Sequence, residues 1–150
     1  MSYGSKFPQL VQQDIRYNCR NWRNAGTLMS MALVLVVDDD TLSLQLLELM
    51  LKREQHVVLT SASNTDTVDL IYQHQPDLVI LNDNMPHVSG GEMCKRIKTD
   101  PRICQTPVVL TSAGQRVRDP NYVRDSRADG VLYKPCVAAD VRTCVNQHLR

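Results

Sequence analysis

Residues 33–40 read Leu-Val-Leu-Val-Val-Asp-Asp-Asp, five aliphatic residues followed by three carboxylates. The aliphatic residues occupy both alternating positions of a strand, so both faces of that strand must be covered. Strands of this kind occur in parallel sheets with helices on both sides, whereas a half-solvated sheet alternates apolar and polar residues. The stretch therefore predicts a buried parallel strand that ends in an acidic cluster.

Four more short apolar runs follow, and amphipathic windows separate them. We expect strands at 33–37, 56–60, 78–82, 107–111 and 131–133. We expect helices at about 42–53, 64–74, 90–98, 120–127 and 138–149. The predicted core positions are Leu46 and Met50 in the first helix, and Val141, Cys144, Val145 and Leu149 in the last. Five β-α units in series predict an α/β protein, a three-layer α/β/α sandwich with a five-stranded parallel sheet of doubly wound, flavodoxin-like topology.

Composition limits the possible functions. The 150 residues fit one domain, and the net charge of +1 with a pI of about 7.7 gives no broad basic surface for nucleic acid or membrane. No apolar run is long enough to span a bilayer. The five cysteines form neither a CxxC pair nor a zinc-type cluster with histidine. We therefore expect a cytoplasmic protein with reduced thiols.

The first 30 residues differ from the rest. They hold four basic side chains against one acidic one, a net charge of +3, which leaves −2 for residues 31–150. Apolar residues recur there at helical spacing, at Val11, Ile15, Cys19 and Trp22. Two interpretations stay open: a short helical extension, or sequence upstream of a true start at Met29 or Met31. We divide the chain into an extension at 1–30 and a domain at 31–150.

Polar side chains follow four of the predicted strands, at 38–40, 82–84, 111–112 and 133–135. In doubly wound sheets ligands bind outside the carboxyl ends of the strands, so these side chains should meet at one edge. Two carboxylates about 4 Å apart repel by about 4 kcal/mol at an effective dielectric near 20. A hard cation such as Mg²⁺ would relieve that repulsion. Asp40 is also a candidate cap for the following helix.

The ordered set of Asp38-Asp39-Asp40, Asn82-Asp83-Asn84-Met85-Pro86, Thr111-Ser112-Ala113 and Lys134-Pro135 resembles response-regulator receivers. The resemblance covers about residues 32–150. The successive spacings also suit that family: 44 residues from Asp38 to Asn82, 29 more to Thr111 and 23 more to Lys134. It implies that Asp38, Asp39 and the main-chain carbonyl of Asn84 would hold Mg²⁺. It further implies that Thr111 would contact a phosphoryl oxygen and that Lys134 would pair with the phosphoryl group or its acceptor.

The chain departs from the family at the acceptor. Three residues before the Met-Pro pair, where the family has its phosphorylated aspartate, this chain has Asn82. A neutral amide cannot attack phosphorus as a carboxylate does. The neighbouring Asp83 should point to the opposite face because side chains alternate along a strand. Because Asn82 stands in place of a third carboxylate, we expect weak Mg²⁺ binding or none. Val131 also stands where many receivers carry an aromatic residue.

These observations predict a non-enzymatic, stand-alone receiver module of phosphorelay signalling. It would act by binding a histidine kinase, an effector or its own copy, without aspartate phosphorylation. One alternative is a conventional phosphoacceptor that uses Asp83. An alternative of another class is a haloacid-dehalogenase-type phosphatase, because Asp38 and Asp40 have the DxD spacing, although Leu42 does not fit that family's pattern.

Overall fold

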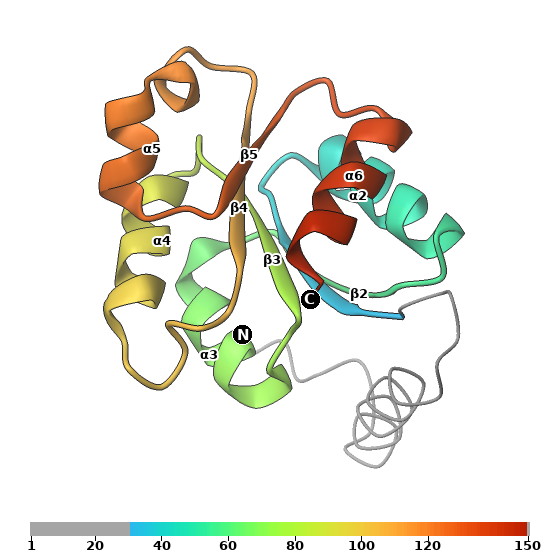
Figure 1. The fold of residues 1–150 in the computed structure, drawn as a ribbon, viewed down its shortest axis with the longest axis horizontal. Coiled ribbons are helices and arrows are strands. Elements are labelled where there is room, and N and C mark those ends of the chain that lie inside the picture. The colour runs from blue at the N-terminus through green and yellow to red at the C-terminus, as the bar shows by residue number, and fades with distance from the viewer. Residues whose placement is uncertain (1–30, 150) are drawn as a thin grey trace.

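Five parallel strands form the centre of the molecule (Figure 1). In the computed structural model, which describes residues 31–149, the strands are β1 (Leu33–Val37), β2 (Val57–Ser61), β3 (Leu78–Asn82), β4 (Val108–Ser112) and β5 (Gly130–Tyr133). They lie in the order β2-β1-β3-β4-β5. The second strand is therefore on one side of β1, and the three later strands are added in turn on its other side. This is the doubly wound, flavodoxin-like order, which confirms the predicted fold class.

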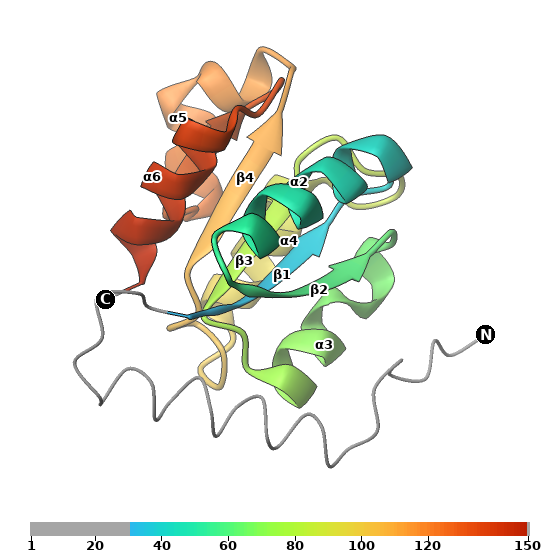
Figure 2. The ribbon, with the colours of Figure 1, turned by 90° about the vertical axis from the view of Figure 1, so that its right-hand side faces the viewer.

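Helices cover both faces of the sheet (Figures 1 and 2). They are α2 (Thr41–Arg53), α3 (Thr67–His74), α4 (Gly90–Thr99), α5 (Pro120–Ser126) and α6 (Ala138–His148), with short 3-10 turns η1 (Asn64–Asp66) and η2 (Arg116–Arg118). Helices α2 and α6 bury Leu47, Leu51 and Val145 against one face. The other core holds Ile71 of α3 and Ile97 of α4. None of the helices described is long and apolar enough to cross a membrane.

Most predicted boundaries lie within one residue of the observed ones. The exception is the start of α3, because residues 64–66 form the turn η1, in which Ser63 accepts a hydrogen bond from the Thr65 amide. Asp119 accepts a hydrogen bond from the Asn121 amide and Pro120 begins α5, as the sequence predicts. The expectations for residues 1–30 lie outside the described residues.

The predicted core face of α2 was right for Met50, which packs against the core, and wrong for Leu46. Leu46 is 43% exposed, whereas Leu47 and Leu51 are buried against the sheet. Residues 41–53 contain leucine on nearly every side of the helix, so their periodicity does not determine which side faces inward. In α6 the prediction was right, because Val141, Cys144 and Val145 are all buried.

Strand register places the polar ends side by side. Val37 pairs with Leu81, so Asp38 follows β1 at the level of Asn82, and Asn82 in turn pairs with Thr111. The last residue of β5, Tyr133, pairs with Ser112, which brings Lys134 to the same edge. Four separate segments of the chain thus contribute to one site.

Candidate functional site

Asp38 lies at the centre of the site and is completely buried. One carboxylate oxygen, Oδ2, accepts a hydrogen bond from Lys134 Nζ at 2.7 Å. The other, Oδ1, accepts from the Asp40 amide at 2.9 Å and from Asn82 Nδ2 at 3.1 Å. A buried carboxylate needs a partner charge and hydrogen bonds to be tolerated. Asp38 has both within the chain itself.

The carboxamide of Asn82 bridges the groups around it. Its Nδ2 lies 3.1 Å from Asp38 Oδ1, 3.2 Å from Asp39 Oδ1 and 3.2 Å from the main-chain oxygen of Asn84. Its Oδ1 accepts from Lys134 Nζ at 3.3 Å. The reverse orientation would place the amide oxygen against two carboxylates, so the network determines which way the amide points. The amide nitrogen therefore lies among the three groups predicted to bind metal.

This arrangement does not fit a tightly held Mg²⁺. The two carboxylates and the Asn84 carbonyl do converge, but the Asn82 amide nitrogen lies within hydrogen-bonding distance of all three. Lys134 already neutralises Asp38, and divalent affinity depends on the charge of the ligands. Among residues 31–149 there is no group of three or more His, Cys, Asp or Glu side chains arranged for a metal ion.

Thr111 contributes a buried hydroxyl that is left without a hydrogen-bond partner. Thr111 pairs in register with Asn82, so the two side chains lie on the same face of the sheet. Leaving a buried polar group unsatisfied costs about 1–3 kcal/mol. An unsatisfied hydroxyl on the same face of the sheet as Asn82 could contact a ligand oxygen. The structure thus brings together all the predicted pocket residues.

Asp83 points away from this pocket, as strand alternation predicts. It is buried, and its Oδ1 accepts from the Gly91 amide at 2.9 Å and from the Tyr122 hydroxyl at 2.5 Å. Its Oδ2 accepts from Arg116, with Nε at 2.9 Å and Nη2 at 2.8 Å. The hydrogen bond to Asp83 raises the pKa of Arg116, and burial, followed by the same carboxylate, raises the pKa of Tyr122. Asp83 is held in a second, separate cluster.

Arg116 and Tyr122 were not predicted from the sequence as partners of Asp83. The signal that could have indicated them is the glycine pair that opens α4. A side chain at Gly90 would place its Cβ 2.5 Å from the main-chain oxygen of Asn82, and one at Gly91 would collide with the Tyr122 hydroxyl. The pair therefore allows α4 to approach both the end of β3 and helix α5.

The sequence also led us to expect reduced cysteines and, at Val131, a non-aromatic residue in the last strand. The cysteines of residues 31–149 are free thiols, and burial raises the pKa of Cys94 to about 12 and that of Cys144 to about 11, which disfavours the reactive thiolate. Val131 is partly buried within β5. The nearest aromatic residue, Tyr133, is 44% exposed at the end of that strand and lies under the Arg118 guanidinium.

Comparison with known proteins shows which family and fold the chain matches. The family model for the response regulator receiver domain matches residues 34–146. The chain is 36% identical over 104 residues to the transcriptional regulatory protein AfsQ1 of Streptomyces coelicolor, covering 69% of this chain but only 44% of AfsQ1. It is 26% identical over 102 residues to the polar-differentiation response regulator DivK of Brucella ovis, covering 68% of this chain and 83% of DivK. The chemotaxis response regulator CheY4 of Vibrio cholerae superposes with a TM-score of 0.72 at 24% identity, over 79% of this chain and 99% of CheY4.

Proposed function

The chain belongs to the response regulator receiver domain family, and from that premise we propose that it signals by binding a protein partner, without storing a phosphoryl group on aspartate. The observation that carries this proposal is the Asn82 carboxamide. It occupies the acceptor position and makes hydrogen bonds to Asp38, to Asp39 and from Lys134. A pocket already balanced in this way needs neither metal nor phosphate to hold its shape.

The chemistry of the amide supports the same conclusion. Phosphoryl transfer to a receiver requires a carboxylate oxygen that attacks phosphorus and becomes part of an acyl phosphate. The Asn82 oxygen is neutral, and an acyl phosphate could form from the amide only with loss of ammonia. Lys134 can stabilise charge on a transferring group, but it cannot supply the missing nucleophile.

The contacts of Asp83 argue against its use as a substitute acceptor. Both of its oxygens are engaged, by Arg116 on one side and by Gly91 and Tyr122 on the other. Entry into the pocket would break these bonds and reverse the direction of the side chain at the end of β3. We propose that Asp83 is structural and fixes η2 and α5 to the end of the sheet.

The contacts of Asp40 argue against the phosphatase alternative. Asp40, the second residue of the DxD spacing, caps helix α2 by accepting from the Leu42 amide at 3.2 Å and from the Ser43 hydroxyl at 2.8 Å. These hydrogen bonds lower the pKa of Asp40, as expected for a capping carboxylate. The residue is thus explained by its structural role.

We propose a histidine kinase, an effector protein or a second copy as the partner, and a cytoplasmic location. The chain spans less than half the length of AfsQ1, so its role within a longer signalling protein is also part of the proposal.

The decisive experiment is incubation of the full chain with acetyl phosphate and Mg²⁺, followed by intact-mass measurement. No gain of a phosphoryl group is expected. The matched control is Asp83→Asn, which removes the one carboxylate of the Asn82-Asp83-Asn84 stretch at the end of β3. If the native chain gains one phosphoryl group and Asp83→Asn does not, Asp83 is the acceptor and the proposal is wrong.

A further inference from the structure

Helix α2 has a second apolar face besides the one that packs on the sheet. Leu42 is 74% exposed, Leu49 is 49% exposed and Leu46 is 43% exposed. Single exposed leucines are ordinary on protein surfaces, but these three lie on one helix of 13 residues. Together with the exposed Arg53 we call Leu42, Leu46 and Leu49 the outer seam. Helix α2 lies at the front of the molecule in Figure 2.

The spacing of the outer seam is that of a coiled-coil interface. Its four positions are separated by four, three and four residues, the d-a-d-a pattern of a seven-residue repeat. Such a narrow stripe packs against another helix, whereas the wider stripe that faces a globular core is here formed by the buried side of α2. The long aliphatic stem of Arg53 can cover apolar surface while its guanidinium stays in water. The seam therefore fits a helix as its occupant.

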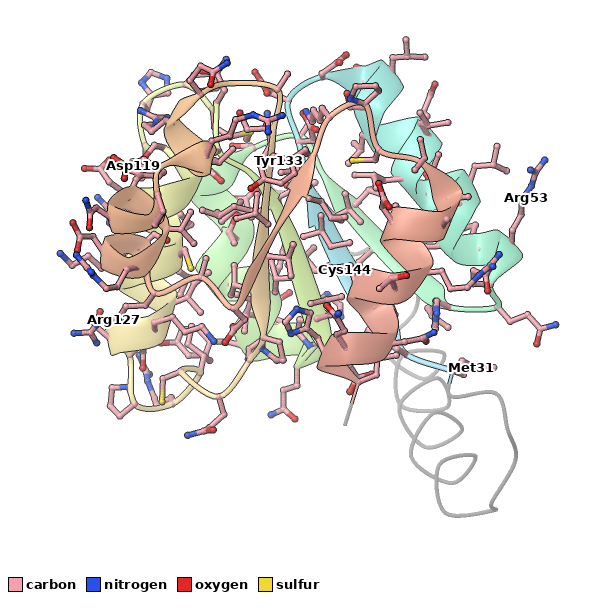
Figure 3. All side chains as sticks on the ribbon, turned by 45° about the horizontal axis from the view of Figure 1, so that its top comes forward. Met31, Arg53, Asp119, Arg127, Tyr133 and Cys144 are labelled. Atoms are coloured by element: carbon pink, nitrogen blue, oxygen red, sulfur yellow. The ribbon has the colours of Figure 1, made fainter. Side chains whose placement is uncertain are left out.

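The charges at the two ends of α2 indicate which helix would occupy the outer seam. Asp39 and Asp40 are exposed at the beginning of α2, and Lys52 and Arg53 are exposed at its end. Figure 3 shows Arg53 projecting from the outer edge of the molecule. If a second α2 lies antiparallel on the first, the acidic end of each helix meets the basic end of the other. A parallel arrangement would bring like charges together at both ends.

We propose that a second copy of this chain docks here, through antiparallel packing of α2 on α2 about a two-fold axis. The interface is isologous, so each contact occurs twice. In the antiparallel coiled-coil register, Leu46 meets Leu49 of the second copy, and Leu42 meets the stem of its Arg53. This inference rests on the proposed function, since it names the second copy as the partner of the module.

The dimer would also act on the pocket. Asp39 is both an acceptor of the Asn82 amide and part of the acidic end of α2. Lys52 is already paired with Glu48 of its own helix at 2.7 Å, so in the antiparallel arrangement it is Arg53 of the second copy that brings positive charge to this end. Opposite charge near a carboxylate cluster reduces its repulsion. Dimer formation and the metal-free pocket would therefore stabilise one another.

Sedimentation velocity of the full chain at low salt, without any phosphodonor, tests the proposal. We expect a monomer–dimer equilibrium in the micromolar range, because one seam per copy is small compared with a stable interface. Leu46→Glu should weaken the dimer at least about tenfold. Tyr133→Ser is the matched control: it removes a similarly exposed side chain on β5, and should leave the equilibrium unchanged. Circular dichroism confirms that each variant is folded.

The direction of packing is tested by Arg53→Glu. In the antiparallel dimer the new carboxylate faces the Asp39 end of the second copy, so association weakens and high salt restores part of it. In a parallel dimer the two basic ends would lie together, so the substitution would remove like-charge repulsion there and strengthen association.

A folded native chain that stays monomeric at all concentrations, or a Leu46→Glu dimer as tight as the native one, would overturn the proposal. Arg53→Glu that strengthens the dimer would overturn the antiparallel arrangement. The outcome is independent of phosphorylation: a chain that is unlabelled by acetyl phosphate but monomeric refutes only the seam. A labelled chain that still dimerises through Leu46 refutes only the function proposed above.

Discussion

Asn82→Asp should produce two linked effects, a loss of stability without metal and a gain of phosphoryl acceptance with it. The new carboxylate would lie about 3 Å from the Asp38 and Asp39 oxygens in place of a hydrogen-bond donor. Two unit charges at that distance repel by about 5 kcal/mol at an effective dielectric near 20. Lys134 Nζ, 3.3 Å from the side-chain oxygen, offsets one such interaction, and exposure of Asp39 weakens the other. The free energy of unfolding should fall by about 3 kcal/mol.

Urea unfolding of Asn82→Asp and the native chain, with and without Mg²⁺, measures this effect. Mg²⁺ should restore most of the stability of the variant and change that of the native chain little, because only the variant has three carboxylates in the pocket. Asn84→Asp is the matched control, since it adds the same charge two residues away on an exposed side chain and should cost little.

Acetyl phosphate labelling then tests the chemistry. Asn82→Asp should gain one phosphoryl group in intact-mass measurement, because Asp38, Thr111 and Lys134 are already in place. If Asn82→Asp is as stable as the native chain when both are measured without Mg²⁺, the Asn82 amide does not offset the repulsion between the Asp38 and Asp39 carboxylates, and our reasoning is refuted. A metal-stabilised variant that stays unlabelled would show that the pocket lacks more than its nucleophile.

Four other outcomes are expected. Isothermal titration of the native chain with Mg²⁺ should give a dissociation constant in the millimolar range or weaker, and a low-micromolar value would contradict the role given to Asn82. A chain that starts at Met31 should melt cooperatively near the full chain's melting temperature; loss of several kcal/mol would place residues 1–30 in the core. Gly91→Ala should destabilise by about 1–3 kcal/mol because its methyl group collides with Tyr122, and should cost more than Gly114→Ala, whose methyl group meets only the Ser112 hydroxyl at 3.2 Å. Burial lowers the pKa of His56 below its usual 6.5, and its neutral Nδ1 accepts from the Ala32 amide, so its contribution to stability is present above about pH 6.5 and is lost as pH falls. The urea midpoint should therefore fall more between about pH 7.5 and about pH 5.5 in the native chain than it does in His56→Gln.

The sequence by itself determined the class of fold and predicted which polar side chains meet at the carboxyl ends of the strands. Strands such as 33–37 are apolar on both faces, and only a parallel sheet covered on both sides accommodates them. Because the carboxyl ends of parallel strands meet at one edge, Asp38, Asn82, Thr111 and Lys134 could be placed together from their order alone. That the predicted acceptor position holds Asn82 in place of an aspartate was likewise evident from the sequence.

Only the tertiary structure decided how these groups satisfy one another. The direction of the Asn82 amide depends on three acceptors and one donor that come from different segments, and no local pattern records their distances. The partners of Asp83 come from η2 and α5, more than 30 residues further along the chain, and their contact depends on how closely α4 packs. The buried side of α2 was not predictable either, since its leucines surround the helix and only contact with the sheet and α6 distinguishes Leu47 from Leu46. Helix periodicity identifies an apolar side only when the other sides are polar, and in this helix they are not.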